Sequence, residues 1–405
     1  MHIKKNCASR WTADAVLLWL FVCCVLAVVL VLGSRGPALN TQDFRCFYAA
    51  GQMLRHSRSL LYDLTAQLHW QRVASGGNVL LPFYHPAYET LLYAPLTLLT
   101  FKTAYLLYAA CNMVLLWVCY LVSCGGSSPF STSRRPVLLF LSFPLLLAIF
   151  VGQNSLLMLL AFTLAYNALA SGNDRRAGLI LGLAIFKLAT VVPLALLLTV
   201  RRGRRFAIGF LTTSAACIAL SILLTGIHGT RDFFRLIAGA TLAADHSIET
   251  QRATAVWLHS MPNVEGLLYL CGTGHLSPHT AFALNAAATL LLLAACAWML
   301  RRTVNNSVAF SAAILGAVLV SPHLYIYDFS ALILPFLLLS HRWLKYVAIL
   351  WFLLLPALYA YGFLTWFAPA VVIPLALLAL CFAQVRSERD EVSVARQTAP
   401  AMAPP

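Results

Sequence analysis

Long apolar runs separated by short polar segments make up most of this chain. Such runs lie at residues 15–32, 103–124, 177–200, 206–225 and 280–300. Each is close to, or longer than, the roughly 18 apolar residues that a helix needs to cross a bilayer. The runs are continuous and do not alternate with a period of two, which excludes a membrane β-barrel, and only helices satisfy their own backbone in lipid over such lengths. The pattern therefore predicts an all-α polytopic membrane protein with about 12 spans.

Composition and charge agree with this pattern. Of the 405 residues, 61% are hydrophobic and only 10% are charged, whereas a soluble domain carries about 25% charged residues. The net charge of +15 comes largely from short basic clusters between apolar runs. These clusters are Lys4-Lys5, Arg134-Arg135, Arg175-Arg176, Arg201-Arg202, Arg204-Arg205, Arg301-Arg302, and Arg342 with Lys345. Clusters of this kind mark cytoplasmic loops, so we expect no nucleic-acid partner.

The charge pattern also sets the expected organisation. Residues 1–385 form one integral-membrane domain of the inner or plasma membrane, and residues 386–405 form a disordered cytoplasmic tail. The run around residues 13–33 is expected to be an uncleaved first span with its N-terminus in the cytoplasm. Two polar outer loops follow, at residues 34–85 and 227–279.

The first outer loop contains a carboxylate close to the membrane surface. Residues 42–58 and 60–74 have the pattern of two amphipathic helices, which suit the interface plane. Asp43 stands at the start of the first of them. A carboxylate there is costly unless it is paired or functional. Two interpretations stay open: Asp43 is a catalytic base, or it is the N-cap of the helix.

The segment of residues 85–99 is apolar but short. If it crossed the membrane together with residues 103–124, the loop with Arg134 and Arg135 would lie outside, against the positive-inside rule. We therefore expect this segment to be a half-helix or to lie at the interface.

Residues 177–200 carry arginines at both ends and Lys187 near the middle. Equal charge at the two ends predicts a tight hairpin of two short helices with Lys187 near its outer tip. Lys187 is then either a snorkelling lysine or a counter-charge for a phosphate.

With this topology, Gln153 with Asn154, Lys187, and the segment from His323 to Asp328 all reach the same side as the first loop. Such convergence is typical of an active site at a membrane surface. His323 and Asp328 follow a helix break at Ser321-Pro322, and they belong either to an ordinary interfacial loop or to a site that contacts a donor phosphate or sugar.

Other chemistries have no support in the sequence. No HExxH, P-loop or GxGxxG motif occurs, and no metal-ligand spacing is present, so neither a metal nor another cofactor is expected. Cys46 and Cys271 fall in the expected outer loops, which permits a disulfide without predicting one.

A set of short motifs resembles glycosyltransferase family 87, the polyprenol-phosphate-mannose-dependent mannosyltransferase-like enzymes of the GT-C superfamily. The motifs are, in order, Asp43-Phe44, Phe47-Tyr48-Ala49-Ala50, Leu61-Tyr62-Asp63, Phe83-Tyr84-His85-Pro86, Ala94-Pro95-Leu96, Gly152-Gln153-Asn154, Ala177-Gly178-Leu179, Phe186-Lys187, Ser321-Pro322-His323 and Tyr327-Asp328. The resemblance implies a GT-C-like bundle, an active site at the outer (periplasmic or extracellular) face, Asp43 as the base and His323 near the donor phosphate. The chain departs from the family at His85, where a proline is frequent, and at Leu188, where a proline often follows the lysine.

The resulting hypothesis is a glycosyltransferase that moves a hexose, mannose as first choice, from a polyprenyl phosphate to a lipid or glycan acceptor with inversion. Asp43 is the predicted base, and the predicted donor-phosphate ligands are His323, Lys187 and Arg45. The predicted substrate contacts are Tyr48, Tyr62, Tyr84, His85, Gln153, Asn154 and Asp328. The alternative is a transporter or lipid flippase without chemistry; nearly charge-free spans and the lack of a strong internal repeat argue against it.

Overall fold

The computed structural model describes residues 43–77, 79–124, 136–241, 256–272, 275–360 and 367–398, and these residues form helices and loops without a strand. The expected first span at residues 13–33 lies outside this part of the chain. Five helical stretches within it are long and apolar enough to cross a membrane: Phe101–Ser123, Asp174–Arg202, Arg204–Gly239, Pro278–Arg302 and Ala368–Asp390. Five shorter apolar helices of 10–17 residues accompany them. The all-helical membrane class is therefore confirmed, while the count of 12 spans stays a prediction.

The stretch from Asp174 to Arg202 is a hairpin and not one long helix. It consists of α10 (Asp174–Leu183), the short 3-10 helix η4 (Ala184–Lys187) and α11 (Leu188–Arg202). The guanidinium of Arg202 lies 3.7 Å from the carboxylate of Asp174, so the two ends of the stretch meet. The predicted hairpin with Lys187 at its tip is thereby confirmed.

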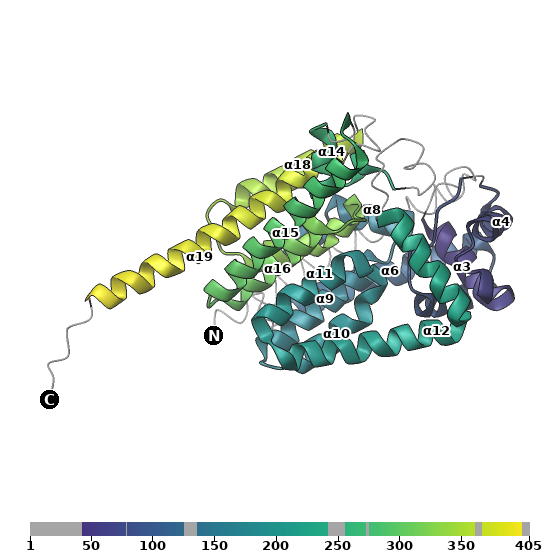
Figure 1. The fold of residues 1–405 in the computed structure, drawn as a ribbon, viewed down its shortest axis with the longest axis horizontal. Helices are drawn as coiled ribbons and strands as arrows, with labels where there is room; N and C mark the ends of the chain where they lie inside the picture. The colour runs from purple at the N-terminus through teal and green to yellow at the C-terminus, as the bar shows by residue number, and fades with distance from the viewer. Residues whose placement is uncertain are drawn as a thin grey trace, which may run out of the picture.

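Helix α12 (Arg204–Thr241) packs along α10 and then turns sharply at Gly226. Gly226 has φ 73° and ψ 179°, a backbone conformation that is essentially restricted to glycine. Beyond the turn, α12 reaches the helices of the first loop, where the ring of Phe233 lies 5.0 Å from that of Tyr62. Figure 1 shows α12 running along one edge of the bundle and bending over at its end.

The first loop folds into α3 (Phe44–His56) and α4 (Leu64–Ser75), which lie at one end of the bundle (Figure 1). Nine of the 13 residues of α3 are buried, including Arg45, which is only 1% exposed. The side chains of α3 therefore pack against protein, while its position in the interface plane stays a prediction. Its apolar side and its flanks are covered by protein: by α4, by the short helices that follow His85, and by α6 (Phe101–Cys124).

Residues 87–98 form three short pieces, namely η2 (Ala87–Glu89), α5 (Thr90–Tyr93) and η3 (Ala94–Leu98). None is long enough to cross a bilayer, so the prediction that this segment does not span is confirmed. These pieces pack against α3, and the rings of Phe47 and Tyr93 stack at 4.8 Å.

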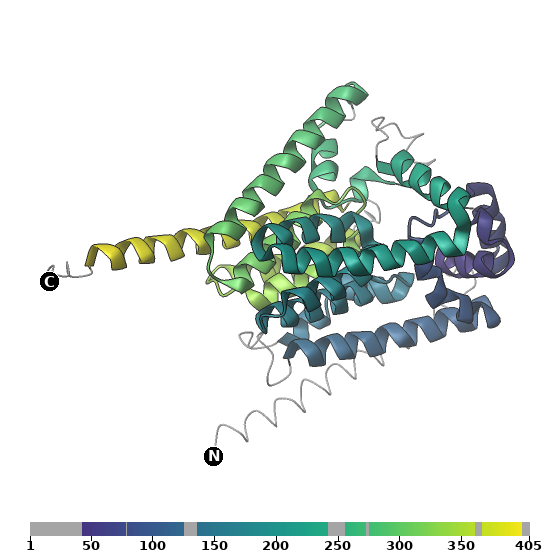
Figure 2. The ribbon, with the colours of Figure 1, turned by 60° about the horizontal axis from the view of Figure 1, so that its bottom comes forward.

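The remaining helices complete the bundle. They are α7 (Pro136–Phe140), α8 (Phe143–Val151), α9 (Ser155–Ala170), η5 (Leu258–Ser260), α14 (Val264–Leu270), α15 (Pro278–Arg302), α16 (Asn306–Val320), η7 (Ile326–Leu332), α17 (Ile333–Leu338), α18 (Leu344–Ala360), η8 (Ala368–Val371) and α19 (Val372–Thr398). Helix α16 is buried along nearly its whole length and forms the centre of the core. Helices α12 and α15 instead leave most of their apolar side chains at least partly exposed, as expected of surfaces that face lipid. Figure 2 shows α15 diverging from the bundle.

The prediction of a disordered tail from residue 386 is wrong for most of that segment. Helix α19 continues to Thr398, and the Glu388 carboxylate accepts a hydrogen bond of 2.8 Å from the Thr303 hydroxyl. The apolar run and the polar tail thus form one helix, because nothing in residues 386–398 breaks it. Residues 399–405 lie outside the described part.

Basic side chains gather at one end of the bundle. Arg201 donates hydrogen bonds to the backbone carbonyls of Leu300 and Thr303, at 2.7 and 2.5 Å, and Arg202 meets Asp174 beside them. Lys187 stands at the other end of α11, about 22 Å away along a helix of this length. The predicted separation of the arginine clusters from the polar site residues is therefore present in the fold.

Candidate active site

Asp43 stands at the N-cap position of α3, but its carboxylate does not cap the helix. The Gln153 amide donates a hydrogen bond of 2.6 Å to Asp43 Oδ2 instead. Asp63 shows the contrast, because its carboxylate accepts a bond of 2.7 Å from the Ala66 amide and caps α4. The N-cap interpretation of Asp43 is therefore wrong.

The surroundings of Asp43 favour its protonated form more than water does. Burial raises the pKa of the Asp43 carboxyl above its ordinary value. The hydrogen bond from Gln153, the positive charge of Lys187 and a hydrogen bond from the Tyr327 side chain offset only part of this rise. A carboxylate tuned upward in this way is typical of a general base.

A glycine turn between α8 and α9 delivers Gln153 and Asn154 to this position. Gly152 ends α8 with φ 74°, and Asn154 begins α9. The Asn154 amide donates a bond of 2.5 Å to Glu89 Oε1. The two neighbouring amides thus hold two different carboxylates.

Lys187 lies at the end of η4, where a buried ion pair fixes it. Its ammonium nitrogen lies 2.9 Å from Asp328 Oδ1 and 3.4 Å from Gln153 Oε1. The Lys187 side chain is 11% exposed and that of Asp328 only 3%. The snorkelling interpretation is therefore wrong. Asp328, which also accepts a bond of 2.8 Å from Ser155, is the counter-ion of Lys187.

A second buried pair joins His85 to Glu89. His85 Nδ1 lies 2.7 Å from Glu89 Oε2, and Tyr93 donates a bond of 2.6 Å to the other oxygen. Burial alone would raise the pKa of Glu89, but the charge of His85 and hydrogen bonds from His85, Tyr93 and Asn154 outweigh it, so that the pKa lies below its ordinary value. Sequence reasoning missed Glu89, although a carboxylate four residues after a histidine in a short apolar segment was a usable signal.

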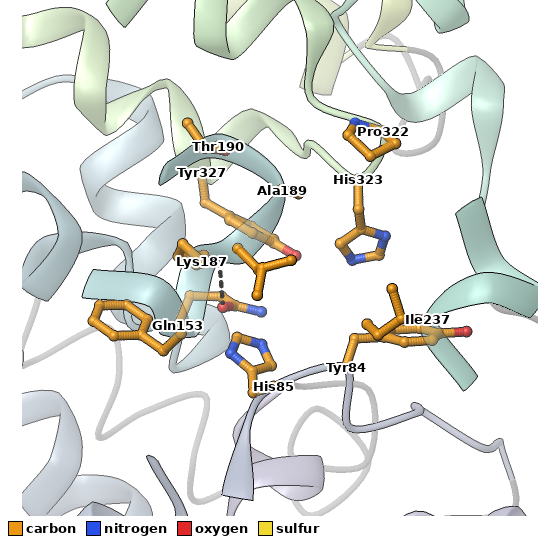
Figure 3. A pocket seen from close by; sticks show the side chains of 12 residues that line it. Tyr84, His85, Gln153, Lys187, Ala189, Thr190, Ile237, Pro322, His323 and Tyr327 are labelled. Atoms are coloured by element: carbon orange, nitrogen blue, oxygen red, sulfur yellow. Dashed lines mark hydrogen bonds between the residues drawn. The ribbon is translucent and has the colours of Figure 1, made fainter. Parts of the chain in front are cut away.

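These groups surround a cavity of about 110 Å³ at the helix ends (Figure 3). It is lined by Tyr84, His85, Gln153, Phe186, Lys187, Leu188, Ala189, Thr190, Ile237, Pro322, His323 and Tyr327. Asp43 and Asp328 lie one side chain behind the wall, in contact with Gln153 and Lys187 respectively. The fold thus brings together segments from the first loop, the α8–α9 turn, the hairpin tip and the break after α16.

His323 reaches the cavity as a neutral imidazole. Burial lowers its pKa to about 4, and the positive charge of Lys187 acts in the same direction. Its Nδ1 is buried and has no hydrogen-bond partner within the described part of the chain. Its ring lies 5.4 Å from that of Tyr84, on the side of the cavity away from Lys187 (Figure 3). At neutral pH, His323 can therefore offer a hydrogen bond but not a charge.

Six of the predicted site residues do not line the cavity. Asp43 and Asp328 lie behind its wall, and Asn154 contacts Glu89 and His85. The other three use their polar groups elsewhere in the fold. Arg45 is buried and donates to the Val79 carbonyl. The Tyr48 hydroxyl donates to the Leu99 carbonyl at 2.7 Å. The Tyr62 hydroxyl donates to the His85 carbonyl at 2.9 Å and so supports the loop that presents His85.

Among the described residues, no group of three or more histidine, cysteine or acidic side chains is placed to hold a metal ion. Cys46 is buried and Cys271 is exposed, and both are free thiols.

Comparison with known protein families decides the assignment. The model of glycosyltransferase family 87 matches residues 83–322, more than half of the chain. The chain belongs to glycosyltransferase family 87. With its apolar helices, this membership makes it a membrane glycosyltransferase, which acts on a sugar donor and an acceptor. The family 87 match contains the cavity residues from Tyr84 to Pro322, whereas Asp43 and His323 lie outside its limits. No curated protein and no solved structure matches the chain.

Proposed function

We propose that this family 87 enzyme transfers a hexose, with mannose as the first candidate, from a polyprenyl phosphate to a hydroxyl group of a lipid or glycan, with inversion at the anomeric carbon. The observation that carries the proposal is the placement of one carboxylate, Asp43, directly behind a small cavity whose wall also bears Lys187, His85 and His323. Such a transfer needs a base that takes the acceptor proton and groups that bind the donor phosphate.

Inverting transfer from a lipid phosphate needs only one carboxylate. Asp43 takes the proton of the acceptor hydroxyl while the acceptor oxygen bonds to the anomeric carbon. The bond from that carbon to the phosphate oxygen breaks, and its electron pair leaves with the polyprenyl phosphate. No acid is required, because a phosphate leaves readily once its charge is balanced.

The pair of Asp43 with Gln153 must open for this step. Gln153 occupies Asp43 Oδ2 and lines the cavity itself. We expect a sugar or acceptor hydroxyl to take the place of the Gln153 amide at Asp43. The raised pKa of Asp43 then favours its acceptance of a proton.

Lys187 and His323 are proposed to contact the donor phosphate, in different ways. Lys187 is already paired with Asp328, so a phosphate would share its ammonium with that carboxylate. His323 would donate a hydrogen bond as a neutral ring, from the side of the cavity away from Lys187. Positive charge clusters at the other end of the bundle, which favours the outer membrane face for the cavity.

The test is a transfer assay with purified protein, a polyprenyl-phosphate mannose donor and a mixed lipid acceptor fraction. Asp43→Asn should lower turnover by at least about a hundredfold, as expected for loss of a general base. Asp63→Asn is the matched control, since asparagine caps a helix as well as aspartate does. Near wild-type turnover of Asp43→Asn would remove Asp43 as the base. Lipid movement without a new glycosidic product would favour the transporter alternative.

A further inference from the structure

Glu89 is a fully buried carboxylate that needs a cation. It is 0% exposed and has three polar partners among the described residues: Tyr93, Asn154 and His85. Of these, only His85 can carry a positive charge. An ionised carboxylate in such a place is costly without a charged partner. The geometry therefore favours an ionised Glu89 paired with a protonated His85.

Contacts on several sides fix the His85 ring. Nδ1 faces Glu89 and also lies 3.5 Å from the Asn154 amide. The rings of Phe47 and Phe83 lie 5.2 and 5.4 Å away. Because Nδ1 is used by Glu89, Nε2 is the nitrogen left for the cavity, which His85 lines beside Gln153 (Figure 3). A protonated His85 would present an N–H donor there.

The charge balance around the cavity calls for such a donor. Three carboxylates, Asp43, Glu89 and Asp328, lie in or directly behind its wall. Lys187 is the lysine that faces them, and it is paired with Asp328. His323 is neutral. Without a charge on His85, the carboxylates in and behind the wall would outnumber the one cation of the wall, Lys187. Such a balance disfavours an anionic phosphate, and more so as the phosphate departs with the electron pair of the broken bond.

We propose that His85 is the second cation of the site, and that its Nε2–H binds the phosphate of the lipid-linked donor while Glu89 positions the ring. This inference rests on the proposed donor chemistry. His85 is then a catalytic residue, because it touches the substrate, and Glu89 is a positioning residue. No proton needs to be transferred: the imidazolium stabilises the charge that the phosphate gains when the bond to the sugar breaks.

The experiment measures binding of polyprenyl-phosphate mannose without acceptor, in detergent, between pH 6 and pH 9. The phosphodiester keeps one charge over this range, so any pH dependence belongs to the protein. Histidine is the side chain that ordinarily changes charge here. We expect the wild-type affinity to fall about tenfold towards pH 9, as for loss of one charge-assisted hydrogen bond.

Variants separate a phosphate ligand from a structural role. His85→Gln should bind about tenfold more weakly at pH 6 and show no pH dependence. His85→Lys should restore binding and keep it up to pH 9. Glu89→Gln should move the loss of binding to lower pH, because the carboxylate that favours the imidazolium is gone. His69→Gln, at an exposed histidine outside the cavity, should match the wild type.

The possible outcomes bear on two different claims. If the wild-type enzyme binds the donor and His85→Gln binds it equally well at every pH, His85 is not the second cation. If the wild-type enzyme does not bind the donor at all, the proposed donor chemistry fails. If His85→Gln does not fold, the pH dependence of the wild type and of His85→Lys decides: equal pH profiles for these two proteins would contradict the proposal.

Discussion

The side-chain amide of Gln153 donates a 2.6 Å hydrogen bond to the carboxylate of Asp43, 110 positions away in the sequence. The same side chain accepts a bond of 3.4 Å from Lys187 through its oxygen. Gln153 therefore links the proposed base to the ion pair of Lys187 and Asp328. Its orientation is fixed by having one partner at each end.

Replacing Gln153 with methionine should change the pH dependence of transfer. The bond from Gln153 lowers the pKa of Asp43 against the effect of burial. Without it, the pKa rises further, and a larger share of Asp43 is protonated and unable to act as a base at mildly acid pH. We expect the acid limb of the pH–rate profile of Gln153→Met to move to higher pH. An unchanged acid limb would show that Gln153 does not influence the pKa of the catalytic base.

Gly152 places Gln153, and an added methyl group there should be harmful. Gly152 has φ 74°, and a Cβ would lie 2.6 Å from Phe44 Cβ, next to Asp43. Gly172 also has a positive φ, 76°, but a Cβ there meets nothing within 4 Å. Gly172→Ala should therefore cost only the strain of the backbone, about 1 kcal/mol. Gly152→Ala should lower the thermal midpoint by more than Gly172→Ala and should also reduce transfer activity; equal effects of the two substitutions would argue against the contact with Phe44.

Part of this site follows from the sequence. Arginines at both ends of residues 174–202 predict the hairpin, and hence the place of Lys187 at its tip. Positive-inside reasoning likewise brings Gln153 and His323 to the same end. These predictions could be made because they depend only on which side of the membrane a segment ends, and the charge pattern indicates that side.

The features that could not be predicted are the contacts between individual side chains. The apolar stripe of α3 looks the same whether it faces lipid or protein, so its burial, and with it the burial of Arg45, is not visible in the pattern. The partner of Lys187 comes from a helix break much later in the chain. Glu89 was not predicted as a site residue because its segment is short and mostly apolar.

The pair of Lys187 and Asp328 gives a prediction about stability. Lys187→Met leaves the Asp328 carboxylate buried without its cation, which is expected to cost about 3 kcal/mol or more. Adding Asp328→Asn removes the unpaired charge and should recover much of that loss. Thermal unfolding of both single variants and the double variant, in one detergent, measures this coupling. Additive losses in the double variant would show that the two groups do not depend on each other.

The lowered pKa of His323 leads to a prediction of how the stability of the folded protein changes with pH. Its pKa is about 4 in the folded protein, against an ordinary value of 6.5. Between these values the unfolded chain binds a proton that the folded protein does not, so stability is highest above pH 6.5 and falls as the pH drops towards 4. The full effect is at most about 3 kcal/mol. His323→Gln should flatten this part of the curve of thermal midpoint against pH, whereas His69→Gln should leave it unchanged. A wild-type midpoint that stays constant from pH 7 to pH 5, at equal detergent and salt, would show that His323 is not held neutral by its surroundings.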